Sequence, residues 1–457
     1  MTAPLPPAPI AAAPRRTWSV GTLTYTTGGL ALLVCWLLWG DFAWWMRERS
    51  AMPMVQLLLK KFQASDLLTG VFLITMPSLT SMIIGPVVSY WSDHHRGRWG
   101  RRIPFLLATT PIVTVAMFGL GLSGELGAAL NRLIGGRPET LHQAVLVVIG
   151  CCWTLFEIGA LTANSVFGAL INDVVPRELI GRFFGVFRAV SLATGILFNA
   201  KIIGHADAHF REIFIGIGLI YAAGLTLMCL RVKEGDYPPP PVEATPANPF
   251  FAAVRSYFRD CFTQRYYLWG IAFFAWGNLA FIPVNTFMLS AAKSHGMSME
   301  TYGRYFVVMF MVSFVLAFPL GWLADRFHPL RVGNAAITAY AAAGVASYLL
   351  VRDSESFGLA LLAHGIFSGC FYTGTAAVCQ VIFPKLQFAQ FAAAAWIVNS
   401  ICQILLGPAL GWFLDLVGNQ YRYAFLSGAV IALATLLAGL VLLRSTPPAG
   451  ATDETSL

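Results

Sequence analysis

The sequence predicts an all-α membrane protein with twelve transmembrane helices arranged as two bundles of six. Composition is the first reason: 57% of the 457 residues are apolar and 11% are charged, whereas about a quarter of the residues in a soluble domain are charged. The second reason is that the apolar residues gather into runs long enough to cross a membrane, which takes about 20 helical residues. The expected helices are 28–59, 67–90, 103–122, 142–171, 182–203, 211–230, 268–290, 301–324, 332–351, 357–381, 389–413 and 422–443.

The basic residues predict which side of the membrane each loop faces. More than half of the 30 Lys and Arg residues lie in the loops of one side, and basic residues beside transmembrane helices stay in the cytoplasm. The net charge of +8 therefore indicates contact with a lipid bilayer and not nucleic-acid binding. An even helix count puts both termini and loop 92–103 in the cytoplasm and Lys60-Lys61 outside. We expect an integral protein of the plasma membrane, or of the bacterial inner membrane.

Five segments follow from this layout. They are a cytoplasmic tail 1–27, a six-helix bundle 28–230, a cytoplasmic linker 231–267, a second six-helix bundle 268–443 and a cytoplasmic tail 444–457. In the linker, Pro238 to Pro241 are typical of a stiff, extended chain. Aromatic residues then recur at helical spacing between 250 and 262, which predicts an amphipathic helix on the inner membrane surface.

Charged residues interrupt the first apolar run at Arg47-Glu48-Arg49. Apolar residues resume at Ala51, and Pro53 alone does not end a helix inside a membrane. We therefore expect one long helix that carries all three charges. The alternative is a short first helix followed by an amphipathic loop.

Several classes of function lack the residues they need. The eight cysteines lie almost all in apolar runs without a Cys-x-x-Cys spacing, so we expect packing residues and not disulfides or metal ligands. The motif Gly-x-x-x-x-Gly-Lys-Ser/Thr is missing from the sequence, so nothing supports an ATP-driven pump. The apolar runs carry no pattern of metal ligands or of a nucleophile with its base, which argues against an enzyme or a sensor. We expect a monomer without a cofactor.

A basic turn between the second and third runs carries a family resemblance. The apolar run containing Gly85 ends at Asp93, and four arginines follow within ten residues: Arg96, Arg98, Arg101 and Arg102. This arrangement resembles the Gly-x-x-x-Asp-Arg-x-Gly-Arg-Arg pattern of major facilitator superfamily transporters. Its longer form, Arg-Gly-Arg-Trp-Gly-Arg-Arg-Ile-Pro-Phe with Gly100 at its centre, is similar to the glycoside–pentoside–hexuronide symporters and sucrose transporters. Ser89 and His94 depart from the pattern. The resemblance implies two pseudo-symmetric six-helix bundles, the major facilitator fold.

The same pattern recurs in the second half of the chain. Gly321-x-x-x-Asp325-Arg326 follows the eighth run, and the eleventh run ends in Gly411-x-x-x-Asp415. Repeats of this kind underlie alternating-access transporters. Small residues allow close helix approach, and an Asp at a turn accepts hydrogen bonds. We expect a structural and gating role for Gly85, Asp93, Arg96, Arg98, Gly100, Arg101, Arg102, Gly321, Asp325, Arg326 and Asp415.

The first run carries the residues of a candidate sugar site. Asp41 and Glu48 lie seven residues apart and so share one helix face, with Trp44 and Trp45 between them. Ionisable residues inside a membrane usually serve function, and a carboxylate beside an aromatic ring suits a sugar. The alternative is an interfacial tryptophan belt with a snorkelling charge pair.

A second resemblance supports this face. Gly40-Asp41-Phe42-Ala43 resembles the first helix of the melibiose permease branch, which implies that Asp41 contacts a sugar. Arg188 falls where that branch has a sugar-site arginine. If both line one cavity, each offsets the other's cost of desolvation. Arg188 could instead be a structural arginine at the cytoplasmic end of its helix.

Carboxylates in the membrane predict the coupling ion. Glu157 and Asn164 form a polar stripe on the fourth run, although such a stripe also suits hydrogen bonding between helices. Sodium-coupled relatives carry two aspartates where this chain has Ser81 and Gly85. Proton coupling through Asp41, Glu48 or Glu157 is therefore expected, with facilitated diffusion as the alternative.

The second half contributes neutral polar and aromatic residues that suit an uncharged polyol, or alternatively packing. They are Asn278 and Asn285 on the seventh run, His364 and Tyr372 on the tenth, and Trp396 and Asn399 on the eleventh. We therefore expect a secondary transporter of a sugar or glycoside. The rivals are an exporter or a carrier of lipid-like substrates with the same fold, and a membrane-embedded enzyme or sensor.

Overall fold

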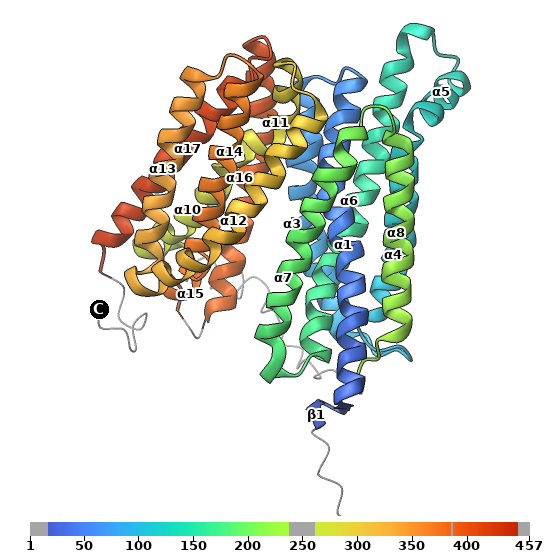
Figure 1. Cartoon of the computed structure of the whole chain (residues 1–457), viewed down its shortest axis with the longest axis vertical. Coiled ribbons are helices and arrows are strands. Elements are labelled where there is room, and N and C mark those ends of the chain that lie inside the picture. The colour runs from blue at the N-terminus through green and yellow to red at the C-terminus, as the bar shows by residue number, and fades with distance from the viewer. Residues whose placement is uncertain (1–16, 237–260, 385–386, 447–457) are drawn as a thin grey trace, which may run out of the picture.

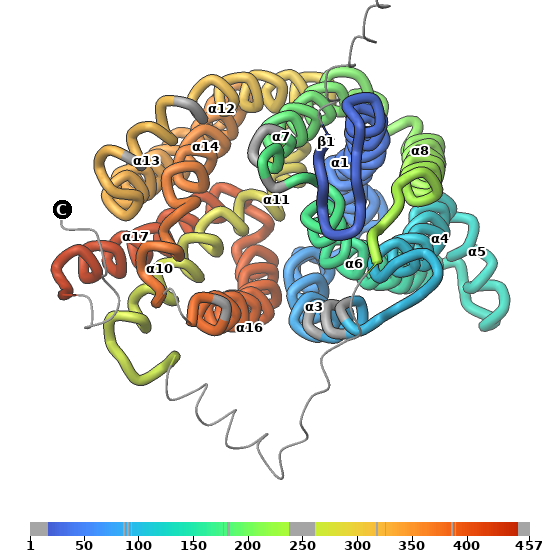
Figure 2. The backbone as a smooth tube through the Cα atoms, turned by 90° about the horizontal axis from the view of Figure 1, so that it is seen from below, coloured from blue at the N-terminus to red at the C-terminus, as the bar shows by residue number. Residues whose placement is uncertain are grey.

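The protein forms two groups of transmembrane helices, seen from the side in Figure 1 and from one end in Figure 2. The structure is a computed structural model that describes residues 17–236, 261–384 and 387–446. The first half contains α1 (Thr27–Lys61), α3 (Met76–His94), α4 (Ile103–Gly121), α6 (Leu141–Val174), α7 (Ile180–Leu197) and α8 (Phe210–Arg231). The second half contains α10 (Arg265–Leu279), α11 (Ile282–Ser294), α12 (Met299–Phe327), α13 (Pro329–Leu350), α14 (Ser354–Gly374), α16 (Phe388–Leu416) and α17 (Arg422–Arg444).

The described residues contain eleven helices, some of them interrupted, that are long and apolar enough to cross a membrane. The remaining helix of the predicted twelve is α13, which has 22 residues and packs against α14 and α17. Seven of its 22 residues are Ala, which is less hydrophobic than Leu, Ile or Val, so its mean hydropathy falls below that of its neighbours. The all-helical membrane fold expected from the sequence is confirmed.

The first helix is a single element of 35 residues, as predicted, with Arg47-Glu48-Arg49 near its middle. Pro53 lies inside the helix without ending it. The alternative of a short first helix is therefore wrong. The linker helix predicted near residues 250–262 falls mostly on residues 237–260, which lie outside the described residues.

Four of the predicted helices are interrupted, which the hydropathy pattern did not indicate. The second comprises α2 (Asp66–Gly70), a π-helical turn and α3, and the fifth continues from α7 into a π-helical turn. The seventh breaks at Ala280 and Phe281 between α10 and α11, and the tenth ends in a separate short helix, α15 (Val378–Ile382). Membrane helices tolerate such breaks where neighbours satisfy the freed backbone groups. At the α10–α11 break, the Tyr340 hydroxyl donates a hydrogen bond to the Ala280 carbonyl oxygen over 3.2 Å.

Two elements lie in segments expected to be loops. Residues 17–26, inside the predicted tail, form an antiparallel hairpin of β1 (Thr17–Val20) and β2 (Leu23–Thr26). Residues 123–133 form α5 (Ser123–Leu133) directly after α4. Both elements are too short to register as membrane runs, so hydropathy alone could not indicate them.

The hydrogen bonds that join the two halves concentrate at one end of the molecule. This end, formed by Lys60, Asp66, Asp415 and Tyr421, is called the closed end below. It lies at the top of Figure 1, away from β1 and from the last described residues. Here α2 and α16 approach so closely that a side chain on Gly70 would overlap the backbone of Gly407. Glycine pairs of this kind let helix backbones touch.

Candidate substrate cavity and gates

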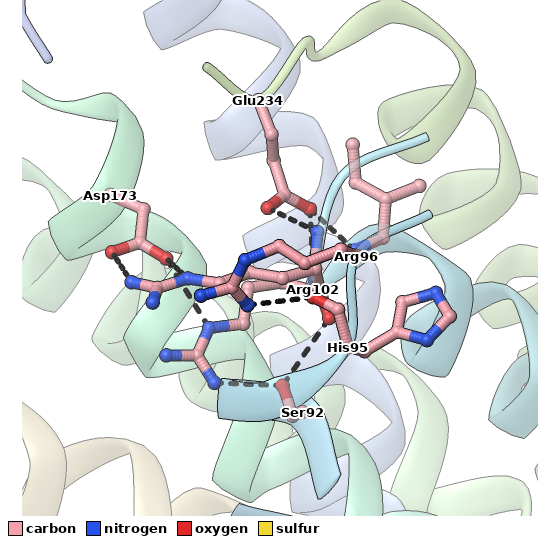
Figure 3. Close-up of polar contacts among 8 residues, drawn as sticks. Ser92, His95, Arg96, Arg102, Asp173 and Glu234 are labelled. Carbon is pink, nitrogen blue, oxygen red and sulfur yellow. Dashed lines mark hydrogen bonds and ion pairs between the residues drawn. The ribbon is translucent and has the colours of Figure 1, made fainter. Parts of the chain in front are cut away.

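The basic turn between α3 and α4 is held by carboxylates of the first half (Figure 3). Arg101 donates two hydrogen bonds to Asp173, at the end of α6, over 2.7 and 3.0 Å. Arg102 donates to the same carboxylate over 3.2 Å and to the Ser92 hydroxyl over 2.7 Å. Paired arginine–carboxylate bonds of this kind are strong and directional. The turn is therefore braced against α6 and α3.

Glu234 caps the start of α4, as Figure 3 shows. Its carboxylate accepts hydrogen bonds from the backbone N–H groups of Arg101, Arg102 and Ile103 over 2.9, 2.8 and 2.7 Å. The first N–H groups of a helix have no partner within the helix, and a carboxylate satisfies both their hydrogen bonds and the helix dipole. Gly100 has a φ of +95°, and a side chain there would overlap Glu234. Position 100 therefore needs glycine, both for its backbone angle and for the space that Glu234 occupies.

Sequence analysis missed both carboxylates of this network. Glu234 follows α8, more than 130 residues after the helix that it caps, and no local motif marks such a distant cap. For the other predicted motif residues, the structure describes the side-chain contacts of some but not of all. Arg96 donates to the His95 carbonyl oxygen over 2.8 Å, and Arg326 lies against the Trp322 ring. The side chains of Asp93 and Asp325 lie outside the described set.

Asp415 makes the corresponding cap at the closed end, and this cap crosses between the halves. Its carboxylate oxygens accept from the backbone N–H groups of Asp66 and Leu67, each over 2.9 Å. The Asp66 carboxylate accepts in turn from Asn419 over 2.7 Å and Tyr421 over 3.1 Å. The second half therefore caps a helix of the first half. The sequence marked Asp415 by its repeat but gave no sign of its partners.

Arg47 is an almost completely enclosed charge of the first helix. Its side chain is 1% exposed and lies 2.9 Å from the Glu48 carboxylate. Its guanidinium also lies over the Trp44 ring at 4.4 Å, and the rings of Phe156 and Tyr221 are within 5.5 Å. An arginine inside a membrane needs a counter-charge or aromatic faces, and Arg47 has both. Trp44 is buried in this structure, against Arg47 and Phe167.

A cavity of about 220 Å³ opens between α1 and α6 beside this ion pair. Its lining includes Glu48, predicted to bind substrate, Glu157, predicted to carry protons, and Asn164 of the same polar stripe, together with Met52. Glu48 is half exposed, with 51% of its side chain accessible. The structure therefore brings together two of the three carboxylates expected to carry protons.

Asp41 and Arg188 do not pair. Asp41 is fully buried, and the side chain that interacts with its carboxylate is Trp45, on the same helix. Arg188 is exposed on α7 and makes no ion pair with any described residue. The expectation that they offset each other's desolvation is therefore wrong for this conformation. The reason is position along α1: Arg188 lies near Arg49, eight residues or about 12 Å beyond Asp41.

Arg49, which the sequence did not mark as a site residue, is a residue of α1 that contacts both α7 and the second half. It donates to the Ser191 hydroxyl of α7 over 3.2 Å. Its guanidinium lies 5.0 Å from the Trp45 ring and 5.0 Å from the Phe310 ring of α12. Arg188 lies one helical turn before Ser191 on α7, which brings it near Arg49. Arg49 thus sits where α1, α7 and α12 meet.

In the second half, Asn285 and His364 form one polar cluster at the α10–α11 break. His364 Nε2 lies 3.0 Å from Asn285 Oδ1, and its Nδ1 lies 3.1 Å from the Tyr340 hydroxyl. Gln56 of α1 donates to the Asn285 carbonyl oxygen over 3.1 Å, which links the cluster to the first half. Asn285 therefore contacts both halves, and its role in binding substrate stays a prediction.

The remaining predicted residues of the second half are scattered. Asn278 donates to the Phe274 carbonyl oxygen in its own helix over 2.8 Å, and Asn399 is 2% exposed. Trp396 is 56% exposed and packs edge-on against Phe274, while Tyr372 packs against Phe281 beside the helix break. The structure does not join these four residues into a single site with the first half.

A family model for the Major Facilitator Superfamily matches residues 37–363 and 284–456. The chain belongs to the major facilitator superfamily. Among curated relatives, the sucrose transport protein SUT4 of Oryza sativa subsp. indica is 30% identical over 154 residues, which is 33% of this chain and 25% of that protein. The membrane-associated transporter protein of Mus musculus is 26% identical over 191 residues, 39% of this chain and 34% of that protein. The matched stretches thus span about a quarter to a third of these relatives.

Solved structures of transporters share the fold over nearly the whole chain. The nucleoside transporter NupG has a TM-score of 0.66 at 12% identity and covers 91% of this chain and 100% of its own. A bacterial homologue of the lysosomal transporter Spinster has a TM-score of 0.61 at 15% identity, covering 92% and 98%. The D-xylose-proton symporter has a TM-score of 0.58 at 15% identity, covering 93% and 98%. At these identities the likeness is one of fold. The chain thus has the fold of this superfamily, as the basic turn between α3 and α4 indicated.

Proposed function

We propose that this protein is a secondary transporter that carries a sugar or glycoside across the membrane by alternating access, coupled to protons. The observation that carries the proposal is the polar lining of the cavity between α1 and α6. Glu48 and Glu157 lie there with Asn164, inside a membrane helix bundle. Ionisable groups at such a depth usually mark the path of a substrate or an ion. Carboxylates and amides are also the groups that bind sugar hydroxyls.

The comparisons support the choice of substrate without identifying it. The curated relatives include sucrose transport proteins, and one solved structure with the same fold is a D-xylose-proton symporter. These relatives match over a quarter of their length, and the structure is 15% identical. They therefore indicate which class of substrate to test first. Sucrose and D-xylose are therefore the first probes.

The positions of the carboxylates inside the membrane favour proton coupling over sodium coupling. The α3 positions Ser81 and Gly85, where sodium-coupled members carry aspartates, provide no carboxylate. Glu157 lies beside the Arg47–Glu48 ion pair in the same cavity. Protonation of Glu157 would change the number of carboxylates that compete for one buried arginine. This is a direct way for a proton to alter how α1 and α6 pack.

Alternating access requires the contacts between the halves to be reversible. The cross-half hydrogen bonds of Asp415 and Asp66 would break when the closed end opens. In the proposed orientation the closed end faces outward and the basic turn faces the cytoplasm, because Arg and Lys beside membrane helices remain inside. Both termini are then cytoplasmic.

The test is uptake into liposomes that contain the purified protein. Labelled sucrose and D-xylose are supplied with an inward proton gradient, with the gradient collapsed by a protonophore, and with sodium replaced by potassium. The proposal expects accumulation that needs the proton gradient and is indifferent to sodium. The Glu157→Gln variant should lose accumulation but keep exchange of sugar across the membrane. Accumulation that strictly requires sodium would refute the coupling mode. A failure of every sugar to be taken up, by protein that is correctly folded, would refute the substrate class.

A further inference from the structure

Helix α5 starts at the level where several transmembrane helices of the first half end. It follows α4 directly, and Glu125 in its first turn forms an ion pair of 2.9 Å with Arg211, at the start of α8. The Cβ of a side chain on Gly121, the last residue of α4, would lie 3.2 Å from the Arg211 carbonyl oxygen. A Cβ on Gly124 would lie 3.7 Å from the ring of Phe62, directly after α1. The ends of α1, α4 and α8 therefore meet at the first turn of α5.

Helix α6 relates the height of α5 to the thickness of the bilayer. A side chain on Gly127 of α5 would overlap Val145 of α6. At about 1.5 Å per residue, the stretch of α6 from Val145 to Val174 is about 43 Å long. Its far end adjoins the basic turn, because Asp173 binds Arg101 there. A bilayer with its headgroup layers is about 40–45 Å thick, so α5 lies at the height of the headgroups at the closed end.

The packing of α5 leaves one apolar face uncovered. Its buried residues recur at helical spacing: Ser123, Gly127 and Asn131. Apolar residues recur at the same spacing on a neighbouring face and are called the α5 stripe below: Leu126, Leu130, Leu133 and the following Ile134. Leu133 is 85% exposed, and Ile134 is 67% exposed. Single exposed apolar residues are common, but a stripe at helical spacing is typical of a helix that contacts lipid.

The surroundings of the stripe suit lipid contact. Figure 2 places α5 at the outer edge of the first half, beyond α4 and away from the second half. Val147 of α6, close to the level of α5, is 56% exposed, so the apolar surface of the bundle reaches this height. Arg132 and Arg137 are exposed beside the stripe, with Glu139 offsetting part of their charge. Arginine can keep its methylene groups on an apolar surface while its charged head reaches lipid phosphates.

We propose that α5 is a membrane-interface helix whose stripe inserts among the phospholipid headgroups of the leaflet at the closed end. The tops of the acyl chains contact Leu126 and Leu133, and phosphate groups lie near Arg132 and Arg137. The helix thereby anchors the adjoining ends of α4 and α6 in that leaflet. This contact involves no substrate, so the inference is independent of the proposed sugar transport.

The test measures the surroundings of spin labels on the full-length protein in liposomes of phosphatidylcholine and phosphatidylglycerol. Single cysteines are introduced after the eight natural ones are replaced. Leu126→Cys and Leu133→Cys report on the stripe, and Arg132→Cys is the matched control on the polar side. Val115→Cys, at an exposed position of α4, gives the reference for lipid, and Glu139→Cys gives the reference for water. Power saturation compares relaxation by oxygen, which concentrates in lipid, with relaxation by a water-soluble nickel complex.

We expect oxygen to relax the labels at 126 and 133 more strongly than the nickel complex does, as at 115. The order should reverse at 132, as at 139. A label at Ile134 then tests the cause: combining Leu126→Ser with Leu133→Ser should shift it towards the nickel complex, because the apolar contacts are lost. Since the stripe side chains are exposed, these changes should leave the gel-filtration profile unchanged.

Three results would overturn the proposal. The first is stronger relaxation by the nickel complex at both 126 and 133, which would mean that water covers the stripe. The second is protection of both positions from both reagents, with a distance between labels at 133 on two copies measurable by pulsed resonance. A second copy of the chain would then cover the stripe. The third is an unchanged oxygen preference at 134 in the double serine variant, which would mean that the stripe does not drive insertion.

Discussion

Replacing Asp415 should open the closed end of the molecule. The Asp415 carboxylate accepts two backbone hydrogen bonds from α2, each 2.9 Å long, and these bonds join the second half to the first. Loss of a carboxylate helix cap costs about 0.5–2 kcal/mol, and hydrogen bonds to a charged group contribute about 1.5–3 kcal/mol each when shielded from water. Because Leu67 is exposed, we take about 1–3 kcal/mol for Asp415→Ala. At about 1.4 kcal/mol per tenfold change, the open population should rise about 5- to 150-fold.

The assay is a distance measurement by pulsed electron paramagnetic resonance between spin labels at Gln63 and Gln420. Both positions are exposed at the closed end, one in each half. The labels are placed in a background whose eight cysteines are replaced. Asp415→Ala should add a longer distance that the parent protein scarcely populates. Asp415→Asn should add less of it, because the amide oxygen still accepts one hydrogen bond. Glu355→Gln, at the start of α14, is the control. An unchanged distance distribution in Asp415→Ala would refute the idea that this cap holds the halves together.

Three further predictions concern orientation, the helix cap and the sugar site. A cysteine at position 97 should react with a membrane-impermeant maleimide only from the cytoplasmic side of intact cells, and labelling from outside would overturn the proposed orientation. Glu234→Ala should lower the stability of the first half by about 1–2 kcal/mol, seen as a lower melting temperature, since three backbone donors lose their acceptor; an unchanged melting temperature would contradict the capping role. Asp41→Asn should abolish sugar uptake while expression and folding persist, and Trp45→Phe should weaken uptake less because a ring face remains. Normal uptake by Asp41→Asn would remove Asp41 from the sugar site and leave the cavity residues Glu157 and Asn164 as its candidates.

The fold could be predicted because a membrane imposes simple rules on the chain. Apolar runs of the required length mark the helices, and α1 could be followed through Arg47-Glu48-Arg49 because apolar residues continue on both sides. The interruptions could not be predicted in this way. The break between α10 and α11 depends on Tyr340, a residue of another helix that satisfies the freed carbonyl group. Hydropathy reads one segment at a time and carries no information on such a partner.

The candidate site was predictable as a set of residues but not as a set of pairs. The sequence marked Glu48 and Glu157 because ionisable side chains are energetically costly inside a membrane. The structure places both in one cavity. The sequence also suggested that Asp41 and Arg188 line one cavity. The structure places Arg188 about 12 Å farther along α1, because the sequence does not fix how one helix is shifted against its neighbour. Arg188 consequently lies beside Arg49, which no spacing rule connects with it.

The two carboxylate caps differ in what they can control. Glu234 caps α4 from the end of α8, and Asp173 binds Arg101 and Arg102 from α6. All of these residues belong to the first half, so these bonds can persist when the halves rotate against each other. The Asp415 cap on α2 crosses between the halves and must break in any motion that opens the closed end. A change at Glu234 should therefore alter stability and leave the distance distribution at the closed end unchanged. A change at Asp415 should do the reverse, and finding both effects in both variants would mean that the two ends are not mechanically independent.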